Sequence, residues 1–358
     1  MRIAQIAPLA ESVPPKLYGG TERIVSYLTE ELVRQGHDVT LFASGDSVTA
    51  ARLNACTPTA LRLNPQVRDT IPHHLLMLER VRQIADGFDV LHFHIDLFQF
   101  PMLRSISTPG ITTLHGRLDL PDLQPFYRTF PDIPLISISD HQRLPMPPVR
   151  WVGTIHHGLP PDLHRFSPTP DPDPYLAFLG RISPEKRPDR AIEIATRADM
   201  RLKIAAKVDN ADIDYWRAEI EPLVRNNPLV EFVGEIGERD KAAFLGGATA
   251  LVFPIDWPEP FGLVMIEAMA CGTPVIAFPC GSVPEVIDHG VTGLLVEDVD
   301  EAVAAVPIAA AMDRATVRAT FEERFSIGRV ATDYLRVYKS LCGRGQPLSP
   351  RETLPLSA

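Results

Sequence analysis

The sequence contains little cysteine, and its cysteines are not arranged as metal ligands. The 358 residues include Cys56, Cys271, Cys280 and Cys342, and no two of them form a CxxC motif. This pattern argues against a disulfide framework or a zinc site and is typical of reduced thiols in a cytoplasmic protein. The chain also lacks an excess of basic residues, since its formal net charge is −10. We therefore expect no nucleic acid and no anionic membrane as a partner held by bulk electrostatics.

An uninterrupted apolar segment that could cross a membrane is missing as well. The most apolar run, residues 261–284, is broken by glycine and proline into a helix, a turn, a strand and a second turn. The first ten residues, MRIAQIAPLA, are too soon interrupted for a signal peptide and predict a strand. We expect a soluble protein.

The length and the alternation of segments predict the fold class. A chain of 358 residues is too long for one ordinary core and suits two domains. Short apolar runs alternate with amphipathic segments in both halves, which is typical of parallel sheets with crossover helices. The Pro-rich residues 167–174 break both kinds of element and are the expected linker. We predict an α/β protein with two Rossmann-like, doubly wound domains that face each other across a cleft.

The predicted domains are residues 1–166 and 175–326. An amphipathic helix at residues 327–342 is expected to pack back on the first domain, and residues 343–358 are expected to form a disordered tail. Strands are predicted at residues 3–7, 39–43, 90–93, 111–114 and 135–137, and then at 175–179, 202–206, 230–233, 250–253 and 275–278. Helices are predicted at residues 21–35, 187–197 and 327–341, around 215–224, and between Gly262 and Cys271.

One carboxylate stands out in the apolar run. Glu267 is the only charged residue between Phe261 and Pro284, and Glu259 precedes it by eight positions. A carboxylate that is buried without a polar partner costs several kcal/mol, so such a residue usually has a partner or a function. On the predicted helix, Glu267 shares the apolar face with Leu263 and Val264. We therefore expect its carboxylate to point into a cleft.

Two cations follow the first strand of the second half. Arg181 leaves the end of that strand, and Lys186 stands at the start of the following helix. A guanidinium fork and an ammonium at one strand end suit a diphosphate. The alternative is an ordinary helix start with cations on the surface.

The first half offers two further candidates. Gly19 and Gly20 close a loop between a strand and a helix, where free N–H groups could cradle an anion. The alternative is a flexible loop with Thr21 as helix cap. His115 follows the strand at 111–114, and ligands of doubly wound sheets bind at the carboxyl ends of the strands. His92 and His94 alternate on a strand, but no acidic residue stands at ligand spacing, so we expect no metal site.

Together these parts resemble the retaining glycosyltransferases of family 4. The resemblance rests on Gly19-Gly20-Thr21, on His115, and on the stretches 180–186 and 259–268, which follow one another in the family's order. It is strengthened by Gly-Thr-Pro-Val-Ile at 272–276 and Val-Pro-Glu-Val at 283–286. The resemblance implies the GT-B fold, a nucleotide-sugar donor and transfer of its sugar to an acceptor, without a metal or other cofactor.

The resemblance also implies roles for individual residues. Arg181 and Lys186 would bind the donor diphosphate, and Glu267 would bind the ribose hydroxyls. The donor sugar would be held by Glu259 and the backbone of Phe261 and Gly262, and would be contacted by His115. Backbone groups near Gly234 and Ile236 would meet the base, and Gly19 and Gly20 would approach the diphosphate. The chain departs from the family pattern at Cys280, Ser282 and His156-His157-Gly158, which bears on donor specificity.

Other functions fit parts of this pattern. A nucleotide-sugar 2-epimerase on the same fold would release a changed sugar without an acceptor. A non-catalytic nucleotide-sugar-binding protein would have no reason to keep the charged set. A phosphorylase would need a lysine in a pyridoxal phosphate pocket, and none is obvious. A NAD-dependent dehydrogenase would need the GxGxxG fingerprint, which is absent. The acceptor and the oligomeric state stay unknown from the sequence, with a soluble acceptor preferred.

Overall fold

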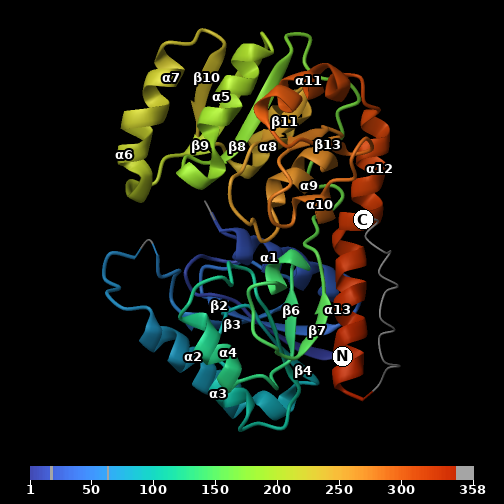
Figure 1. Ribbon diagram of the computed structural model, residues 1–358. Coiled ribbons are helices and arrows are strands. Elements are labelled where there is room, and N and C mark those ends of the chain that lie inside the picture. Colours follow the sequence, from blue (N-terminus) through green and yellow to red (C-terminus); the bar gives the residue numbers. More distant parts are fainter. Residues whose placement is uncertain (17–18, 63, 344–358) are drawn as a thin grey trace.

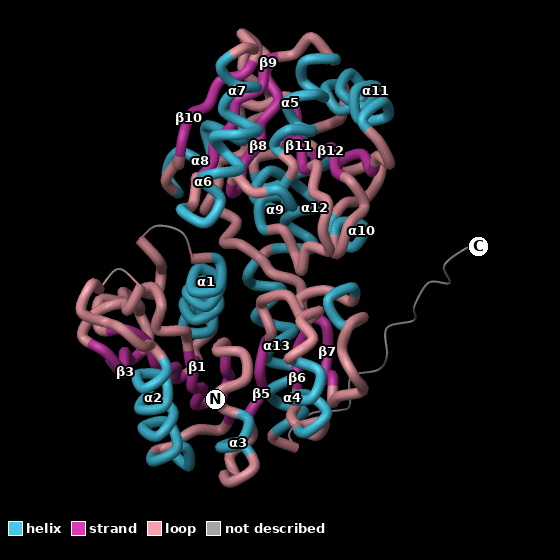
Figure 2. Tube along the Cα trace, turned by 60° about the vertical axis from the view of Figure 1, so that its left-hand side comes forward, coloured by secondary structure: helices cyan, strands magenta, loops and turns pink. Residues whose placement is uncertain are grey.

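The computed structural model describes residues 1–16, 19–62 and 64–343, and these residues form two lobes (Figure 1). The lower lobe in this view contains the first half of the chain, and the upper lobe contains most of the second half. Each lobe is built on one parallel sheet with helices packed against it, as Figure 2 shows from another side. This is the predicted pair of Rossmann-like α/β domains. Of the tail expected at 343–358, only Gly343 belongs to the described residues.

The first sheet has seven strands in the order β3-β2-β1-β4-β5-β6-β7. All of its pairings are parallel, with Ile3 of β1, for example, opposite Val39 of β2 and Val90 of β4. The strands are β1 Arg2–Ile6, β2 Asp38–Ser44, β3 Arg52–Thr57, β4 Val90–Phe93, β5 Gly110–Thr113, β6 Leu135–Ser137 and β7 Trp151–Thr154. Its helices are α1 Gly20–Arg34, α2 Ile71–Gln83, α3 Phe100–Leu103 and α4 Leu123–Thr129.

The second sheet has six strands in the order β10-β9-β8-β11-β12-β13, again all parallel. The strands are β8 Tyr175–Arg181, β9 Arg201–Lys207, β10 Val230–Gly234, β11 Ala250–Phe253, β12 Val275–Ala277 and β13 Gly293–Leu295. Its helices are α5 Pro188–Arg197, α6 Ile213–Tyr215, α7 Glu221–Arg225, α8 Glu238–Gly246, α9 Leu263–Ala270, α10 Val283–Val286, α11 Val299–Ala310 and α12 Arg314–Phe325. A π-helical turn, Trp216–Ile220, joins α6 to α7.

The last helix, α13 (Ile327–Leu341), returns to the first domain. It follows α12 after the single residue Ser326 and runs down beside the first sheet (Figure 1). Its apolar face, which includes Val330, Tyr334 and Tyr338, packs with Leu28 and Leu32 of α1 in one buried cluster. The second domain is therefore followed by a helix that belongs to the core of the first.

The chain crosses between the domains at two adjacent places. Leu159 donates its N–H to Phe325 and accepts from the N–H of Ile327, so both crossings are hydrogen-bonded side by side. The predicted linker, residues 167–174, does not lie there. Ser167 N–H bonds to Cys271 O and Asp171 N–H to Gly247 O, so this segment lies on the second domain. Its prolines interrupt secondary structure, but its backbone is held by that domain.

Among the described residues, no helix combines the length and the apolar character that crossing a bilayer requires.

Candidate functional site

A cavity of about 810 Å³ lies between the two domains. Its walls include the carboxyl ends of β8 and β9 and the loops that follow β1, β5 and β11. This is the place where doubly wound sheets bind ligands, and the volume is in the range of small-molecule sites. The predicted site residues that line it are Gly19, Gly20, His115, Arg181, Lys186, Ile236, Glu259, Phe261, Gly262 and Glu267. Gly234, the last residue of β10, is not among the described lining residues, although Glu235 and Ile236 are.

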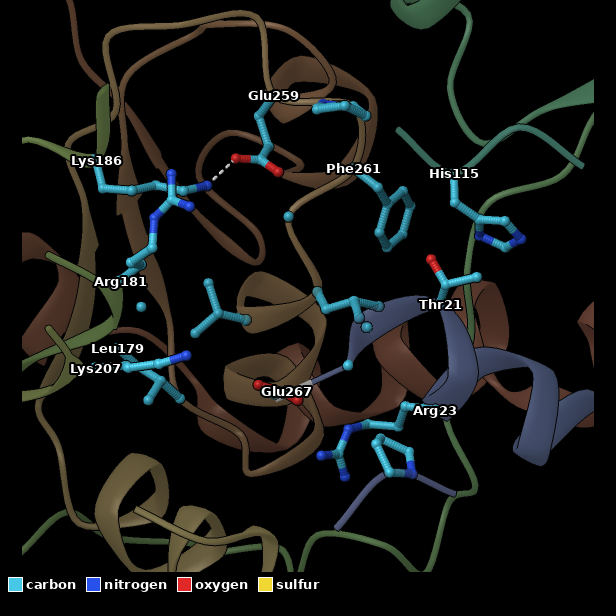
Figure 3. A pocket seen from close by; sticks show the side chains of 18 of the residues that line it. Thr21, Arg23, His115, Leu179, Arg181, Lys186, Lys207, Glu259, Phe261 and Glu267 are labelled. Atoms are coloured by element: carbon cyan, nitrogen blue, oxygen red, sulfur yellow. Dashed lines mark hydrogen bonds and ion pairs between the residues drawn. The ribbon is translucent and has the colours of Figure 1, made fainter. Parts of the chain in front are cut away.

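Lys186 and Glu259 contact each other at one end of the cavity (Figure 3). The indole N–H of Trp257 donates to the same carboxylate oxygen of Glu259 at 2.9 Å. The Lys186 ammonium also lies 5.1 Å from the centre of the Trp257 ring. Lys186 follows β8 and Glu259 follows the paired strand β11, so only the fold brings them together.

Arg181 ends β8 and stands on the same wall as Lys186 (Figure 3). Its guanidinium bonds to Glu185 at 2.5 Å and lies 3.4 Å from Asp212, while its side chain stays 41% exposed. Lys207 at the end of the neighbouring β9 lines the cavity as well. The wall formed by these two strand ends therefore offers several cations to an anion.

Glu267 is buried on α9, with 3% of its surface exposed. Its carboxylate accepts a hydrogen bond of 2.6 Å from the Lys241 ammonium. Burial alone would raise the pKa of Glu267, but Lys241, followed by His164, outweighs burial and lowers it. Burial would lower the pKa of Lys241, and the charges of Glu267 and Glu238 raise it instead. The sequence predicted this carboxylate correctly as inward-pointing but did not predict its cation.

The same corner holds a group with metal-ligand chemistry. Ligand atoms of His164, Glu238 and Glu267 lie within 4.8 Å of one another. Lys241 contacts both carboxylates, at 3.3 Å for Glu238 and 2.6 Å for Glu267. Arg23 of α1 pairs with Glu238 as well. Two side-chain cations thus already neutralise the carboxylates that a metal ion would need.

The starts of α1 and α9 lie close together at the cavity. Gly20 is the first residue of α1, and a Cβ atom on it would stand 3.7 Å from Leu263 at the start of α9. Gly262, which precedes α9, has φ 76°, and a Cβ there would meet Met265 at 2.8 Å. Glycine at 262 therefore permits the sharp turn that starts α9 toward the cavity.

His115 follows β5 and reaches the cavity from the first domain. Its Nε2 lies 2.9 Å from His94 Nδ1, and its ring stacks on that of His157 with centroids 5.2 Å apart. Phe261 of the second domain packs edge-on against His157 at 4.9 Å. Burial lowers the pKa of His115 to about 3, so the ring is neutral.

A second contact between the domains was not predicted. Glu285 of α10 accepts the backbone N–H groups of Asp140 and His141, at 2.7 and 2.8 Å, and lies 3.1 Å from His156 Nε2. Burial would raise the pKa of Glu285, and these hydrogen bonds lower it. The ion pair of Arg23 with Glu238 is another polar bridge across the cleft. No local pattern marks such residues, because each partner lies more than a hundred positions away.

A smaller cavity of about 230 Å³ adjoins His115 on the first domain. The Phe98 ring, 36% exposed, stacks on His74 with centroids 5.4 Å apart. Asp96 has φ 56°, and its carboxylate has no hydrogen-bond partner among the described residues. The cavity wall, as far as the structure describes it, contains neither lysine nor arginine.

Comparisons with known proteins agree with this geometry. Residues 161–324 match the family described as Glycosyl transferases group 1, and residues 18–141 match Glycosyltransferase Family 4. The chain is 27% identical over 387 residues to the phosphatidyl-myo-inositol mannosyltransferase of Mycobacterium leprae, covering 96% of this chain and 98% of the relative.

Two solved structures share the fold. The sucrose-phosphate synthase of Thermosynechococcus elongatus superposes with a TM-score of 0.75 at 22% identity, covering 96% of this chain and 99% of the other. The HepE protein of Anabaena, solved with UDP and glucose, superposes with a TM-score of 0.69 at 16% identity, covering 95% and 100%. The architecture is therefore the GT-B fold, as the resemblance implied.

Proposed function

Because this chain belongs to glycosyltransferase family 4 and is a glycosyltransferase, we propose that it moves a hexosyl group from a nucleoside-diphosphate sugar to a hydroxyl acceptor, with retention and without a metal ion. The large cavity is the observation that supports a nucleoside-diphosphate sugar as the donor. Arg181 and Lys186 stand on one wall, and the buried carboxylate of Glu267 stands on α9. Cations suit a diphosphate, and a carboxylate suits a pair of ribose hydroxyls.

The residues divide the reaction between them. Arg181 and Lys186 stabilise the negative charge that develops on the leaving diphosphate. Glu259, next to Lys186, holds hydroxyls of the donor sugar. The acceptor hydroxyl attacks from the face of the sugar that the diphosphate leaves, and a donor phosphate oxygen takes its proton. Positioning and charge stabilisation in a closed cleft supply the acceleration, and no covalent carboxylate intermediate is required.

The relatives favour a hexose as the transferred sugar. One is named a mannosyltransferase, and a neighbour in fold is named a sucrose-phosphate synthase. We propose mannose or glucose as the sugar and a uridine, guanosine or adenosine diphosphate as its carrier. HepE, which was solved with UDP and glucose, supports this choice of donor class.

The smaller cavity is the proposed place of the acceptor. It borders His115, and its wall offers an aromatic ring and the accessible carboxylate of Asp96. A sugar or cyclitol ring presents a C–H face to an aromatic ring and O–H groups to a carboxylate. A neutral polyhydroxylated ring therefore suits this wall better than a phosphate group, which Asp96 would repel.

The first experiment is a thermal-shift titration with UDP-, GDP- and ADP-linked glucose and mannose, with and without Mg²⁺. A ligand that binds only the folded protein raises its apparent stability. We expect a shift with one nucleotide, independent of Mg²⁺ and lost in Arg181→Ala. Arg197→Ala, which removes a surface ion pair with Asp300, is the matched control and should keep the shift.

Product analysis then separates the transferase from its alternatives. Transfer to an added polyol supports the proposal. Release of nucleotide with a changed free sugar would instead indicate a 2-epimerase, and binding without turnover under all conditions would indicate a non-catalytic binding protein. No shift with any nucleotide sugar would contradict the donor class.

A further inference from the structure

Buried side chains connect His115 to the C-terminal helix α13 by consecutive hydrogen bonds. From His115, contacts lead to His94 (2.9 Å), to Gln5 (2.8 Å) and to the hydroxyl of Tyr338 (3.2 Å). From Tyr338 they continue to His92 (2.7 Å), Thr113 (2.8 Å) and Tyr334 (3.0 Å). Apart from His115, which borders the cavity, every member is at most 2% exposed.

We call this series of hydrogen-bonded side chains, from His115 to Tyr334, the relay. Its histidines are neutral. Burial lowers the pKa of His92 and of His94 well below the ordinary value and that of His115 to about 3. A neutral imidazole has one N–H donor and one acceptor nitrogen, so each hydrogen bond fixes the role of the other nitrogen. Along the relay, the choice of donor and acceptor in one hydrogen bond therefore fixes the choice in the next.

The amide of Gln5 sets that choice. Its carbonyl oxygen faces His94 Nε2 and can only accept, so His94 carries its proton on Nε2. His94 Nδ1 is then an acceptor, and His115 must donate to it from Nε2. The proton of His115 thus stands on Nε2, and Nδ1 keeps its lone pair. Among the described residues, Nδ1 of His115 is buried and has no hydrogen-bond partner.

The amide of Gln5 is itself oriented by Tyr338. Its NH₂ group donates to the Tyr338 oxygen, which lies 2.7 Å from His92 Nδ1, so the Tyr338 hydroxyl is placed to donate to that nitrogen. Without that oxygen, nothing in the relay opposes rotation of the amide. Rotation would turn the NH₂ group toward His94, and the donor and acceptor roles would reverse as far as His115.

We propose that Tyr338, Gln5 and His94 are positioning residues that hold His115 as the Nε2–H tautomer, with Nδ1 ready to accept a hydrogen bond from a substrate hydroxyl. An unpaired buried acceptor costs free energy that such a hydroxyl recovers. The assignment of the hydroxyl to the substrate rests on the proposed function, whereas the tautomer does not. Because Tyr338 is on α13, the helix that returns from the second domain would control the tautomer of a histidine that lines the cavity.

The test compares two tyrosines of the same helix. Tyr338→Phe removes the oxygen that orients Gln5, whereas Tyr334→Phe removes a hydroxyl at the far end, which contacts only the rotatable hydroxyl of Thr113. Both rings are buried, at 0% and 1% exposure, so both changes preserve the packing. Long-range ¹H–¹⁵N correlation spectra of histidine-labelled protein report which nitrogen carries the proton, and His115→Gln assigns the signal.

We expect the Nε2–H signature for His115 in the wild type and in Tyr334→Phe, and a mixed or Nδ1–H signature in Tyr338→Phe. An Nδ1–H signature in the wild type, or the same signature in all three proteins, would overturn the proposal. If Tyr338→Phe does not fold, Gln5→Leu removes the amide itself, which fixes the proton of His94, and should give the same change.

The same samples separate this inference from the proposed function. Nucleotide affinity should stay within about twofold of the wild type in both tyrosine variants, since neither residue lines the large cavity. Loss of the tautomer change with normal nucleotide binding refutes the relay alone. A normal tautomer change without any nucleotide binding refutes the proposed function alone.

Discussion

At the scale of single residues, the two carboxylates of the segment 259–267 have different surroundings. The carboxylate of Glu267 is buried on α9 and forms an ion pair with Lys241. Glu259 is more accessible, with 12% of its side chain exposed, and is bonded by Lys186 and Trp257. Under the proposed function, the first keeps a fixed charge beside the ribose, and the second lies beside the cations that bind the diphosphate.

Glu267→Gln should weaken nucleotide binding. The change keeps the shape of the side chain but replaces a charged acceptor by an amide, which costs about 1.5 to 3 kcal/mol, or about ten- to a hundredfold in affinity. Isothermal titration with the nucleoside diphosphate found by the thermal-shift screen measures the effect. Glu259→Gln is the matched control and should change sugar-dependent turnover far more than affinity for the diphosphate. Equal losses of diphosphate affinity in the two variants would contradict the assignment.

Lys241→Met should reverse the pH dependence that Glu267 contributes to stability. In the wild type the pKa of Glu267 is lowered, so its contribution is present above the ordinary value of 4.5 and is lost as pH falls through the lowered pKa. Without Lys241, burial dominates and raises the pKa, so the contribution is lost as pH rises.

Urea unfolding between about pH 4 and pH 7 measures these slopes. The double variant Lys241→Met/Glu267→Gln is the reference and should lack the rising-pH loss. If Lys241→Met and the wild type have the same slope, the ion pair does not set the charge of Glu267.

Chelation should leave activity unchanged. Arg23 and Lys241 already pair with the carboxylates of Glu238 and Glu267, so a metal ion would have to displace them. We expect equal donor turnover with EDTA and with added Mg²⁺ or Mn²⁺. A loss with EDTA that Mn²⁺ restores would assign a metal to His164, Glu238 and Glu267 instead.

The cations beside Glu267 and Glu238 could not be predicted from the sequence. An isolated carboxylate in an apolar run was enough to single out Glu267. Nothing near Lys241 in the sequence distinguishes it from a surface lysine, because its partner is 26 positions away on another helix. Asp96 was also missed; its position is set by a turn after β4 in which its φ is 56°.

At the scale of elements, α9 depends on the turn that precedes it. Gly262 has a positive φ, and its position brings Phe261 and the start of α9 to the cavity. Gly262→Ala should destabilise the protein by about 1 to 2 kcal/mol or more, since a Cβ is strained at positive φ and would also meet Met265. Urea unfolding measures the loss.

Gly87→Ala is the matched control for this change. Its φ is not positive, and a Cβ there has no neighbour within 4 Å. The control should stay within about 0.5 kcal/mol of the wild type. Equal stability of the two variants would mean that the turn before α9 does not require glycine at position 262.

Burial explains which elements could be predicted. The central strands β4 and β11 are buried at every position, so apolar runs mark them in the sequence. The edge strands β3 and β7 were missed, because most of their residues are only partly buried and their patterns are mixed. The predicted helix around 215–224 is interrupted by a π-helical turn, which no periodicity indicated.

At the scale of the whole molecule, the domains are joined by two chain crossings and two polar bridges. The crossings meet at Leu159, and the bridges are Arg23 with Glu238 and Glu285 with the first domain. These contacts join the first domain to the second.

Removing both bridges should open the cleft. We expect Arg23→Ala/Glu285→Gln to increase the radius of gyration in small-angle X-ray scattering, because both polar bridges across the cleft are then lost. Arg197→Ala, which breaks an ion pair within the second domain, should not. An unchanged scattering curve in the double variant would mean that packing at α1, α9 and α13 holds the domains by itself.

The sequence by itself determined the fold class, the two Rossmann-like halves and a minority of the residues that line the cavity, among them Arg181, Lys186 and Glu267. It could do so because interior strands, glycine turns and an isolated carboxylate are local features. Only the tertiary structure decided the position of the crossings, the cations beside Glu267 and the relay from α13 to His115. These depend on contacts between residues up to 333 positions apart, and no local pattern records which distant side chains a fold brings together.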